Sequence, residues 1–262
     1  IVIGQIQAIT YNEFLPALLG KRAISSYEGY DESVNPGIAT EFSSAAFRFG
    51  HSTLNEDIEF FGNDGRAVRE DVALRDAFFQ ASLLEETGID SILKYDASST
   101  AQESALEVVD DLRNVLFGAR GAGGLDLVAF NIQRGRDHGL SDYNATRVAY
   151  GLEAVDSFDQ ITDNVELQEK LASLYGDVNN VDLWVGLMAE DHERGSSVGE
   201  LTGTIIADQF ERTRDGDRFY YENVFSGEEL RSIDRTTLAD VIERNTTVEG
   251  LQENVFFMRA EV

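Results

Sequence analysis

The chain has 262 residues, a formal net charge of −27, two prolines and no cysteine. This length can bury a sizeable core as one domain or two, and no proline-rich or low-complexity stretch marks a linker. The charge would repel nucleic acid and anionic lipid, and the lack of cysteine excludes disulfides, thiolate metal sites and cysteine nucleophiles. No apolar run approaches the roughly 20 residues that a membrane-spanning helix needs.

The first predicted helices lie near the N-terminus. The opening IVIGQIQAIT is typical of a helix interior, so we expect the sequence to be cut from a longer one. The following TYNEFLPALLG has a capping box at Thr10 and Glu13 and ends on Gly20, with a kink or second start expected at Pro16.

Residues 39–54 (ATEFSSAAFRFGHSTL) carry apolar residues at helical spacing. A continuous α-helix here would place Ser44, Arg48, His51 and Asn55 on one face, opposite the phenylalanines. A glycine beside the histidine costs roughly 1 kcal/mol relative to alanine, which is reasonable if a bulky group lies against the backbone there. Taken alone, the pattern favours a core histidine bonded to a neighbour over a ligand.

Further helices are predicted along the rest of the chain. Residues 100–118 show a capping box at Thr100 and Glu103 and an apolar stripe that ends at Gly118. The same periodicity marks residues 164–176, 181–190, 198–216 and 237–246, whereas RFYYENVF (218–225) alternates like a short strand. The sequence therefore predicts a mainly α protein.

Few residues could carry chemistry in such a chain. It has three histidines, with no HExxH spacing and no G-x-S-x-G elbow, so neither a zinc site nor a serine nucleophile is indicated. The glycine-rich residues 118–126 lack the Lys-Ser/Thr of a phosphate-binding loop, and we expect an ordinary loop.

The segment LVAFNIQRGRDHGL (127–140) is the most unusual one. An apolar run leads directly into Asn131, Gln133 and Arg134. Burying such groups costs kilocalories unless something satisfies them, so the pattern indicates a polar partner at this place.

These segments also carry a resemblance to a known family. FRFGHSTL (47–54) and LVAFNIQRGRDHGLSDYNATR (127–147) resemble the two signature segments of the animal-type haem peroxidases, which include myeloperoxidase, lactoperoxidase and peroxidasin. Residues 8–20, 182–223 and the final VFFMR region are similar to the family as well, in the same order. The resemblance covers almost the whole chain.

The resemblance implies a role for each polar residue. It makes His51 the proximal ligand of haem iron and Asn131 the acceptor of a hydrogen bond from the other ring nitrogen of that histidine. It makes Arg48 and Arg134 partners of the haem propionates. The chemistry agrees, because a metal-bound imidazole needs an acceptor that fixes its tautomer, and guanidinium suits a buried carboxylate.

Other polar residues of these segments have simpler interpretations. We expect Arg136, Asp137 and His138 to hold the turn after the helix rather than contact haem. His192 is typical of a solvated histidine at a helix end and has no ligand partner nearby in the sequence.

The resemblance also implies that something precedes this chain. The family's distal histidine, glutamine and arginine, its calcium loop and the acids that esterify haem all lie before the proximal segment, and His51 leaves no room for them. We therefore expect residues 1–262 to be the C-terminal, proximal part of a single multi-helical haem peroxidase domain. The expected cofactor is haem b, which residues upstream could link covalently, and any calcium would bind outside this chain.

The expected activity is the oxidation of halide or small aromatic donors by hydrogen peroxide, in a secreted, bacterial protein that responds to oxidative stress. Two alternatives stay open. Fatty-acid dioxygenases related to cyclooxygenase carry a radical-forming tyrosine three residues before the proximal histidine, where this chain has Arg48. The chain could also stand alone as a helical binding or structural module without catalysis.

Overall fold

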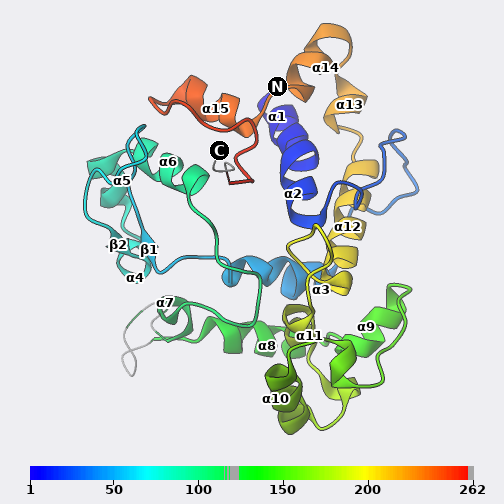
Figure 1. The fold of residues 1–262 in the computed structure, drawn as a ribbon. Coiled ribbons are helices and arrows are strands. Elements are labelled where there is room, and N and C mark those ends of the chain that lie inside the picture. The colour runs from blue at the N-terminus through cyan, green and yellow to red at the C-terminus, as the bar shows by residue number, and fades with distance from the viewer. Residues whose placement is uncertain (115, 117, 119–123, 259–262) are drawn as a thin grey trace.

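The computed structural model describes residues 1–114, 116, 118 and 124–258. Helices make up most of the regular structure, as predicted, and the two short strands β1 (Asp57–Ile58) and β2 (Val72–Ala73) pair antiparallel (Figure 1). The first half of the chain contains the short helices α4 (Leu74–Ala77), α5 (Ala81–Thr87), α6 (Asp90–Ser98) and α7 (Asp110–Arg113). The second half contains the longer helices and most of the core.

One long helix opens the chain, and it does not begin at Thr10. It runs through α1 (Val2–Ile9), the π-helical turn η1 (Thr10–Phe14) and α2 (Leu15–Leu19). The predicted capping box is wrong, because the Thr10 hydroxyl donates to the carbonyl of Ile6, 2.8 Å away within the same helix. The predicted end is confirmed, since Gly20 leaves the helix with φ 91°.

Over the described part of residues 100–118, the predicted helix is wrong except at α7. Residues 99–109 form a loop held by distant partners: the Gln102 amide donates to the carbonyl of Thr53 at 3.0 Å, and the Ala105 amide donates to the hydroxyl of Ser52 at 3.2 Å. These backbone groups are satisfied without a helix, so tertiary contacts override the apolar periodicity. The glycine-rich stretch that follows lies mostly outside the described residues.

The helices predicted in the second half are confirmed. They are α10 (Val165–Tyr175), α11 (Leu183–Ala189), α12 (Glu200–Asp215) and α15 (Leu238–Asn245). Helix α15 begins with a complete capping box between Thr237 and Asp240. The strand predicted over 218–225 is wrong, because the helix α13 (Tyr221–Val224) forms there and is followed by α14 (Gly227–Asp234).

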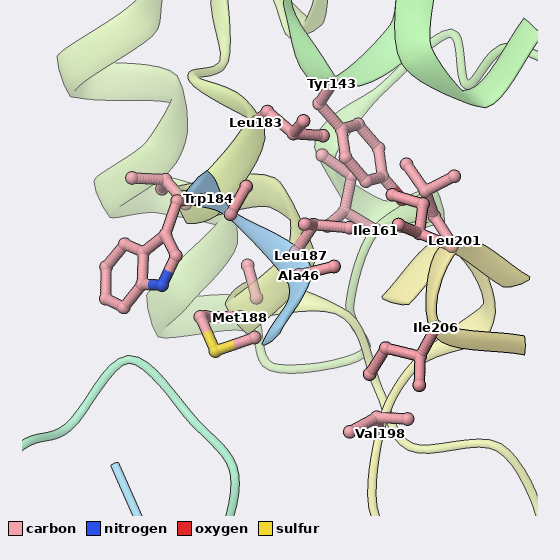
Figure 2. Packing of buried hydrophobic residues seen from close by; sticks show 14 of the residues in the cluster. Ala46, Tyr143, Ile161, Leu183, Trp184, Leu187, Met188, Val198, Leu201 and Ile206 are labelled. Atoms are coloured by element: carbon pink, nitrogen blue, oxygen red, sulfur yellow. The ribbon is translucent and has the colours of Figure 1, made fainter. Parts of the chain in front are cut away.

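The core is centred on α11, every residue of which is buried. Figure 2 shows Trp184, Leu187 and Met188 of this helix packed beside Ala46 and among side chains from α12 and the preceding loops. Trp184 is the single tryptophan, and its indole N–H has no hydrogen-bond partner within the described part of the chain. Helix α11 packs against α8 (Leu127–Asp137), α9 (Tyr143–Ala149) and α12.

The outer face of α1 is apolar and exposed. Ile1, Val2, Ile3 and Ile6 each expose at least 60% of their surface, whereas Gly4 and Ala8 face the protein. Within the described ranges, no helix is both long and apolar enough to cross a membrane.

Candidate functional site

The histidine segment forms two short helices rather than one. Helix α3 (Thr40–Ser44) ends at Ala45, where φ is −136° and ψ −73°, and the 3₁₀ helix η2 (Ala46–His51) follows. A 3₁₀ helix has three residues per turn, so Arg48 and His51 lie on the same side of η2. The predicted face is therefore confirmed for this pair and wrong for Asn55, which lies beyond η2 and donates to the hydroxyl of Tyr95 at 2.8 Å.

Helix α8 delivers the asparagine to this pair. Asn131 is completely buried, and its amide nitrogen lies 3.0 Å from Nδ1 of His51. Its carbonyl oxygen accepts a hydrogen bond of 3.1 Å from Nη1 of Arg48. One amide thus joins the arginine to the histidine, although 80 residues separate Asn131 from His51 in the sequence.

The polarity of the histidine contact differs from the one that the family resemblance implies. With the amide nitrogen toward the ring, Nδ1 of His51 is the acceptor and the ring proton sits on Nε2. A histidine that binds iron through Nε2 carries its proton on Nδ1 and needs an acceptor there. The amide of Asn131 would have to rotate to serve that form.

Two guanidinium groups lie near one another at this place. Burial, and in addition the positive charge of Arg134, lower the pKa of Arg48. Neither arginine has a carboxylate within ion-pair distance among the residues that the structure describes. Two neighbouring cations without an ion-pair partner in this described part of the chain favour an anion, and the two carboxylates of a haem group fit that need.

The surroundings of His51 favour its neutral form. Burial lowers its pKa most, and the charge of Arg48 lowers it further. A neutral imidazole is the form that binds iron. Beside it, a Cβ added at Gly50 would meet no atom within 4 Å, so the space next to this backbone is open.

The rest of the 127–140 segment is bound to neighbouring protein groups. Arg136 donates twice to Asp182, at 2.8 and 2.6 Å, and Nδ1 of His138 lies 2.8 Å from the hydroxyl of Ser44. These contacts fit the predicted role of Arg136 and His138 in holding the turn, and Asp137 accepts a hydrogen bond from the side-chain amide of Gln133 at 2.7 Å. The expectation that the whole polar run is buried is wrong, because Asn131 is buried whereas Gln133 and Arg134 are exposed.

His192 is less solvated than predicted. Its Nε2 donates to the carbonyl of Ser104 at 2.7 Å, and its Nδ1 lies 3.7 Å from a carboxylate oxygen of Glu103. It therefore fixes the 99–109 loop to the end of α11. No group of three or more metal-ligating side chains occurs in the described ranges.

A buried polar network in the core was missed at the sequence level. Glu190, at the end of α11, accepts hydrogen bonds from the hydroxyl of Tyr143 at 2.9 Å and from the amides of Leu201 and Thr202 at 3.1 and 3.2 Å. Arg147 lies 3.5 Å from the same carboxylate. The only signal in the sequence was a polar, charged group at the end of a fully apolar helix.

A helical fold that brings a half-buried histidine, a buried amide and two unpaired arginines together defines a candidate haem-binding protein. The sequence profile of the animal haem peroxidase family matches residues 1–256. The chain belongs to the animal haem peroxidase family.

Individual proteins that are similar to this chain support the same family. The chain is 40% identical over 256 residues to peroxinectin A of Dictyostelium discoideum, covering 97% of this chain and 48% of that protein. It is 37% identical over 269 residues to the human peroxidasin homolog, covering 98% of this chain and 18% of that protein. The chain thus spans about half of the first relative's length and less of the second's.

Solved structures show the same fold. Peroxidase A of Dictyostelium discoideum superposes with a TM-score of 0.89 at 39% identity, covering 97% of this chain and 49% of that one. A fatty acid alpha-dioxygenase of Arabidopsis thaliana superposes with a TM-score of 0.76 at 21% identity, covering 92% of this chain and 46% of that one. The second likeness shows a shared fold. The prediction of a helical haem peroxidase fold is confirmed.

Proposed function

We propose that this chain supplies the proximal haem side of a peroxidase that uses hydrogen peroxide to oxidise halide or small aromatic donors. The observation that carries the proposal is the contact series Arg48–Asn131–His51, with Arg134 beside it and, among the described residues, no carboxylate within ion-pair distance of either arginine. The residues fit haem b: His51 would bind the iron through Nε2, and Arg48 and Arg134 would pair with the propionates.

The bound haem supplies the redox chemistry that activates peroxide. The residues of this chain hold and tune it. His51 is kept neutral by burial and by Arg48, so it is ready to bind metal without losing a proton first. Asn131 fixes the ring plane of His51. The hydrogen bond between His138 and Ser44 holds the end of α8 against α3.

The proposal includes a partner for this chain. Acid–base catalysis on peroxide, any covalent haem link and any calcium loop are assigned to the part of the relatives' domain that precedes the matched region. An extracellular location is part of the same proposal and is consistent with the strongly acidic composition.

The test is haem binding by the protein that contains this chain. Replacing His51 with glycine should abolish the Soret band, and added imidazole should restore it by filling the vacated position. His138→Ala and His192→Ala are the controls and should keep the band, because both side chains are bound to protein groups elsewhere. An unchanged spectrum in the His51 variant would overturn the proposal.

Peroxidase and dioxygenase activity can be separated in the same preparation. Position 48 holds arginine, and its Nη1 is bound to Asn131, so no phenol occupies the place from which the dioxygenases are expected to abstract hydrogen. We expect peroxide-dependent oxidation of bromide or guaiacol and no oxygen uptake with palmitate. Oxygen uptake with palmitate would instead favour fatty-acid dioxygenase activity.

A further inference from the structure

A row of aromatic rings in contact, here called the aromatic file, leads away from η2, the helix that carries His51. Successive ring centroids lie 5.8, 5.7, 6.0, 5.4 and 4.8 Å apart. The six members of this aromatic file are, in order, Phe49, Phe47, Phe210, Tyr11, Tyr220 and Tyr221.

The file crosses the molecule between two distant places. It begins in η2, two residues from His51, passes through α12 and the π turn η1, and ends at the start of α13. In Figure 1 the opening helix runs along α12, with α3 near one end of the pair and α13 and α14 near the other. The aromatic file follows this pair of helices.

The rings of the file differ in how easily they are oxidised. Phenylalanine is too hard to oxidise to hold an electron vacancy, so Phe47, Phe49 and Phe210 can serve only as the medium between the haem and the first tyrosine. A phenol can be oxidised when its proton has somewhere to go. The hydrogen-bond partner of each tyrosine hydroxyl therefore decides where a radical would settle.

Tyr11 has a poor proton acceptor. Its hydroxyl donates to the backbone carbonyl of Phe210 at 2.7 Å, which is not basic. The guanidinium of Arg214 lies 5.8 Å from the centre of its ring and opposes further positive charge. Tyr11 can pass an electron onward but does not retain the oxidation.

Tyr221, by contrast, has a good proton acceptor. Its hydroxyl donates to Oδ1 of Asp234 at 2.9 Å, and this carboxylate belongs to an exposed residue. Tyr221 itself is buried, with 1% of its surface exposed. Burial, together with Asp234, raises the pKa of Tyr221, so the phenol keeps its proton at neutral pH and loses it only along with the electron.

We propose that Tyr221 is a second oxidation site, connected to the haem by the aromatic file and separated from the surface only by its exposed partner Asp234, so that it can be reduced by donors too large to reach the haem. The inference rests on the proposed function, which supplies the oxidant, a haem oxidised by peroxide. Tyr221 gives up one electron, which passes through Tyr220 and Tyr11 to the haem and reduces it by one equivalent. The O–H bond breaks, its proton moves to Asp234, and a neutral tyrosyl radical remains. A phenolic donor at the surface returns one electron, Asp234 gives its proton back to the phenol oxygen, and the proton of the donor is released to water.

The test is freeze-quench electron paramagnetic resonance on the haem-loaded protein after peroxide addition, with absorption spectra recorded in parallel. We expect a tyrosyl signal that narrows when the tyrosines carry ring deuterium. Tyr221→Phe, which keeps the ring and removes only the hydroxyl, should lose this signal. Asp234→Asn should lose it too, because the phenol remains but its proton acceptor does not.

Tyr175→Phe is the matched control. Tyr175 also donates to a carboxylate, that of Asp182 at 3.0 Å, and it has no ring contact with the aromatic file in the described part of the chain. This variant should keep the signal. A tyrosyl signal that survives in Tyr221→Phe, or an oxidised haem without any tyrosyl signal, would overturn this inference alone. A haem whose spectrum peroxide does not change would overturn the proposed function with it.

Discussion

The amide of Asn131 cannot serve both of its neighbours equally once a metal is bound. It has one accepting and one donating side, and at present it accepts from Arg48 and donates toward His51. Iron on Nε2 would place the ring proton on Nδ1, and the accepting side would have to turn to His51. The donating side would then face Arg48, itself a donor, so haem binding would free this arginine to pair with an anion.

This contact could be predicted only in part. Composition and helical spacing drew attention to His51 and to the polar end of the 127–140 segment. Nothing in those patterns joined two residues 80 positions apart, and that pairing came from the family resemblance. The direction of the hydrogen bond depends on which amide atom faces the ring, and no sequence pattern encodes it.

An aspartate at position 131 should change the iron's potential. A carboxylate accepts from both Arg48 and His51 and places negative charge next to the ligand, which favours ferric iron. In Asn131→Asp the ferric/ferrous potential should fall, and halide oxidation should weaken more than phenol oxidation, by about 10–100-fold. Gln133→Glu, with the same charge change on an exposed position of α8, should leave the potential unchanged. Spectroelectrochemistry measures both, and an equal or higher potential in the aspartate variant would contradict the prediction.

The pH range of haem binding should depend on Arg48. Because the pKa of His51 is lowered, protons compete with iron only at a pH below that of an ordinary histidine. Arg48→Gln removes one cause of that shift, so the pH at which haem is half released should rise. Arg134→Gln also removes an anion partner, and it should weaken affinity with a smaller change in this midpoint. A titration followed at the Soret band gives both values; an unchanged midpoint in Arg48→Gln would show that the arginine does not act on His51.

At the scale of elements, the sequence predicts helices well where their ends are fixed locally. Helix α10 begins at the side chain of Asn164 and ends at Gly176, whose φ is 71°. Residues 100–109 have the same kind of signals, but Gln102 and Ala105 donate from their backbone to residues 53 and 52, about 50 positions earlier, and the segment is a loop. The break at Ala45 is equally invisible, because the residues on both sides have ordinary helix propensities.

Helix α11 should be intolerant of a single added methyl group. A Cβ at Gly186 would lie 2.3 Å from the ring of Tyr143, whose hydroxyl is fixed by Glu190. We expect Gly186→Ala to lower the free energy of unfolding by about 1–3 kcal/mol, the usual cost of overpacking. Gly203→Ala is the matched helical control: its Cβ would approach Val198 no closer than 3.8 Å, and alanine's propensity should add up to about 1 kcal/mol. Urea denaturation compares the two, and equal effects would refute the prediction.

At the scale of the whole molecule, a large net charge and an exposed apolar helix face act on self-association in opposite directions. A net charge of −27 keeps copies of the chain apart, while the outer face of α1 offers contiguous apolar side chains. Salt screens the repulsion but not the apolar attraction. Raising the ionic strength should therefore favour apolar attraction between copies of the chain over their charge repulsion.

The isolated chain should self-associate through α1 as salt is raised. Ile3→Glu, at a position that is 71% exposed, should reduce this association, since it interrupts the apolar face without touching the core. Ile38→Glu is the control, because Ile38 is 59% exposed elsewhere on the molecule. Sedimentation velocity at low and high salt distinguishes them. Equal association of both variants would place the contact on another surface.

The lone tryptophan gives the protein a built-in optical reporter. Trp184 is 2% exposed and lies on α11, which packs against both α8 and η2, the two helices that carry Asn131 and His51. Its emission should therefore be that of an indole shielded from water, at short wavelength. A haem bound at His51 would accept excitation energy from it. Titrating haem should quench the tryptophan fluorescence in parallel with the growth of the Soret band. Unfolding should restore the emission at longer wavelength.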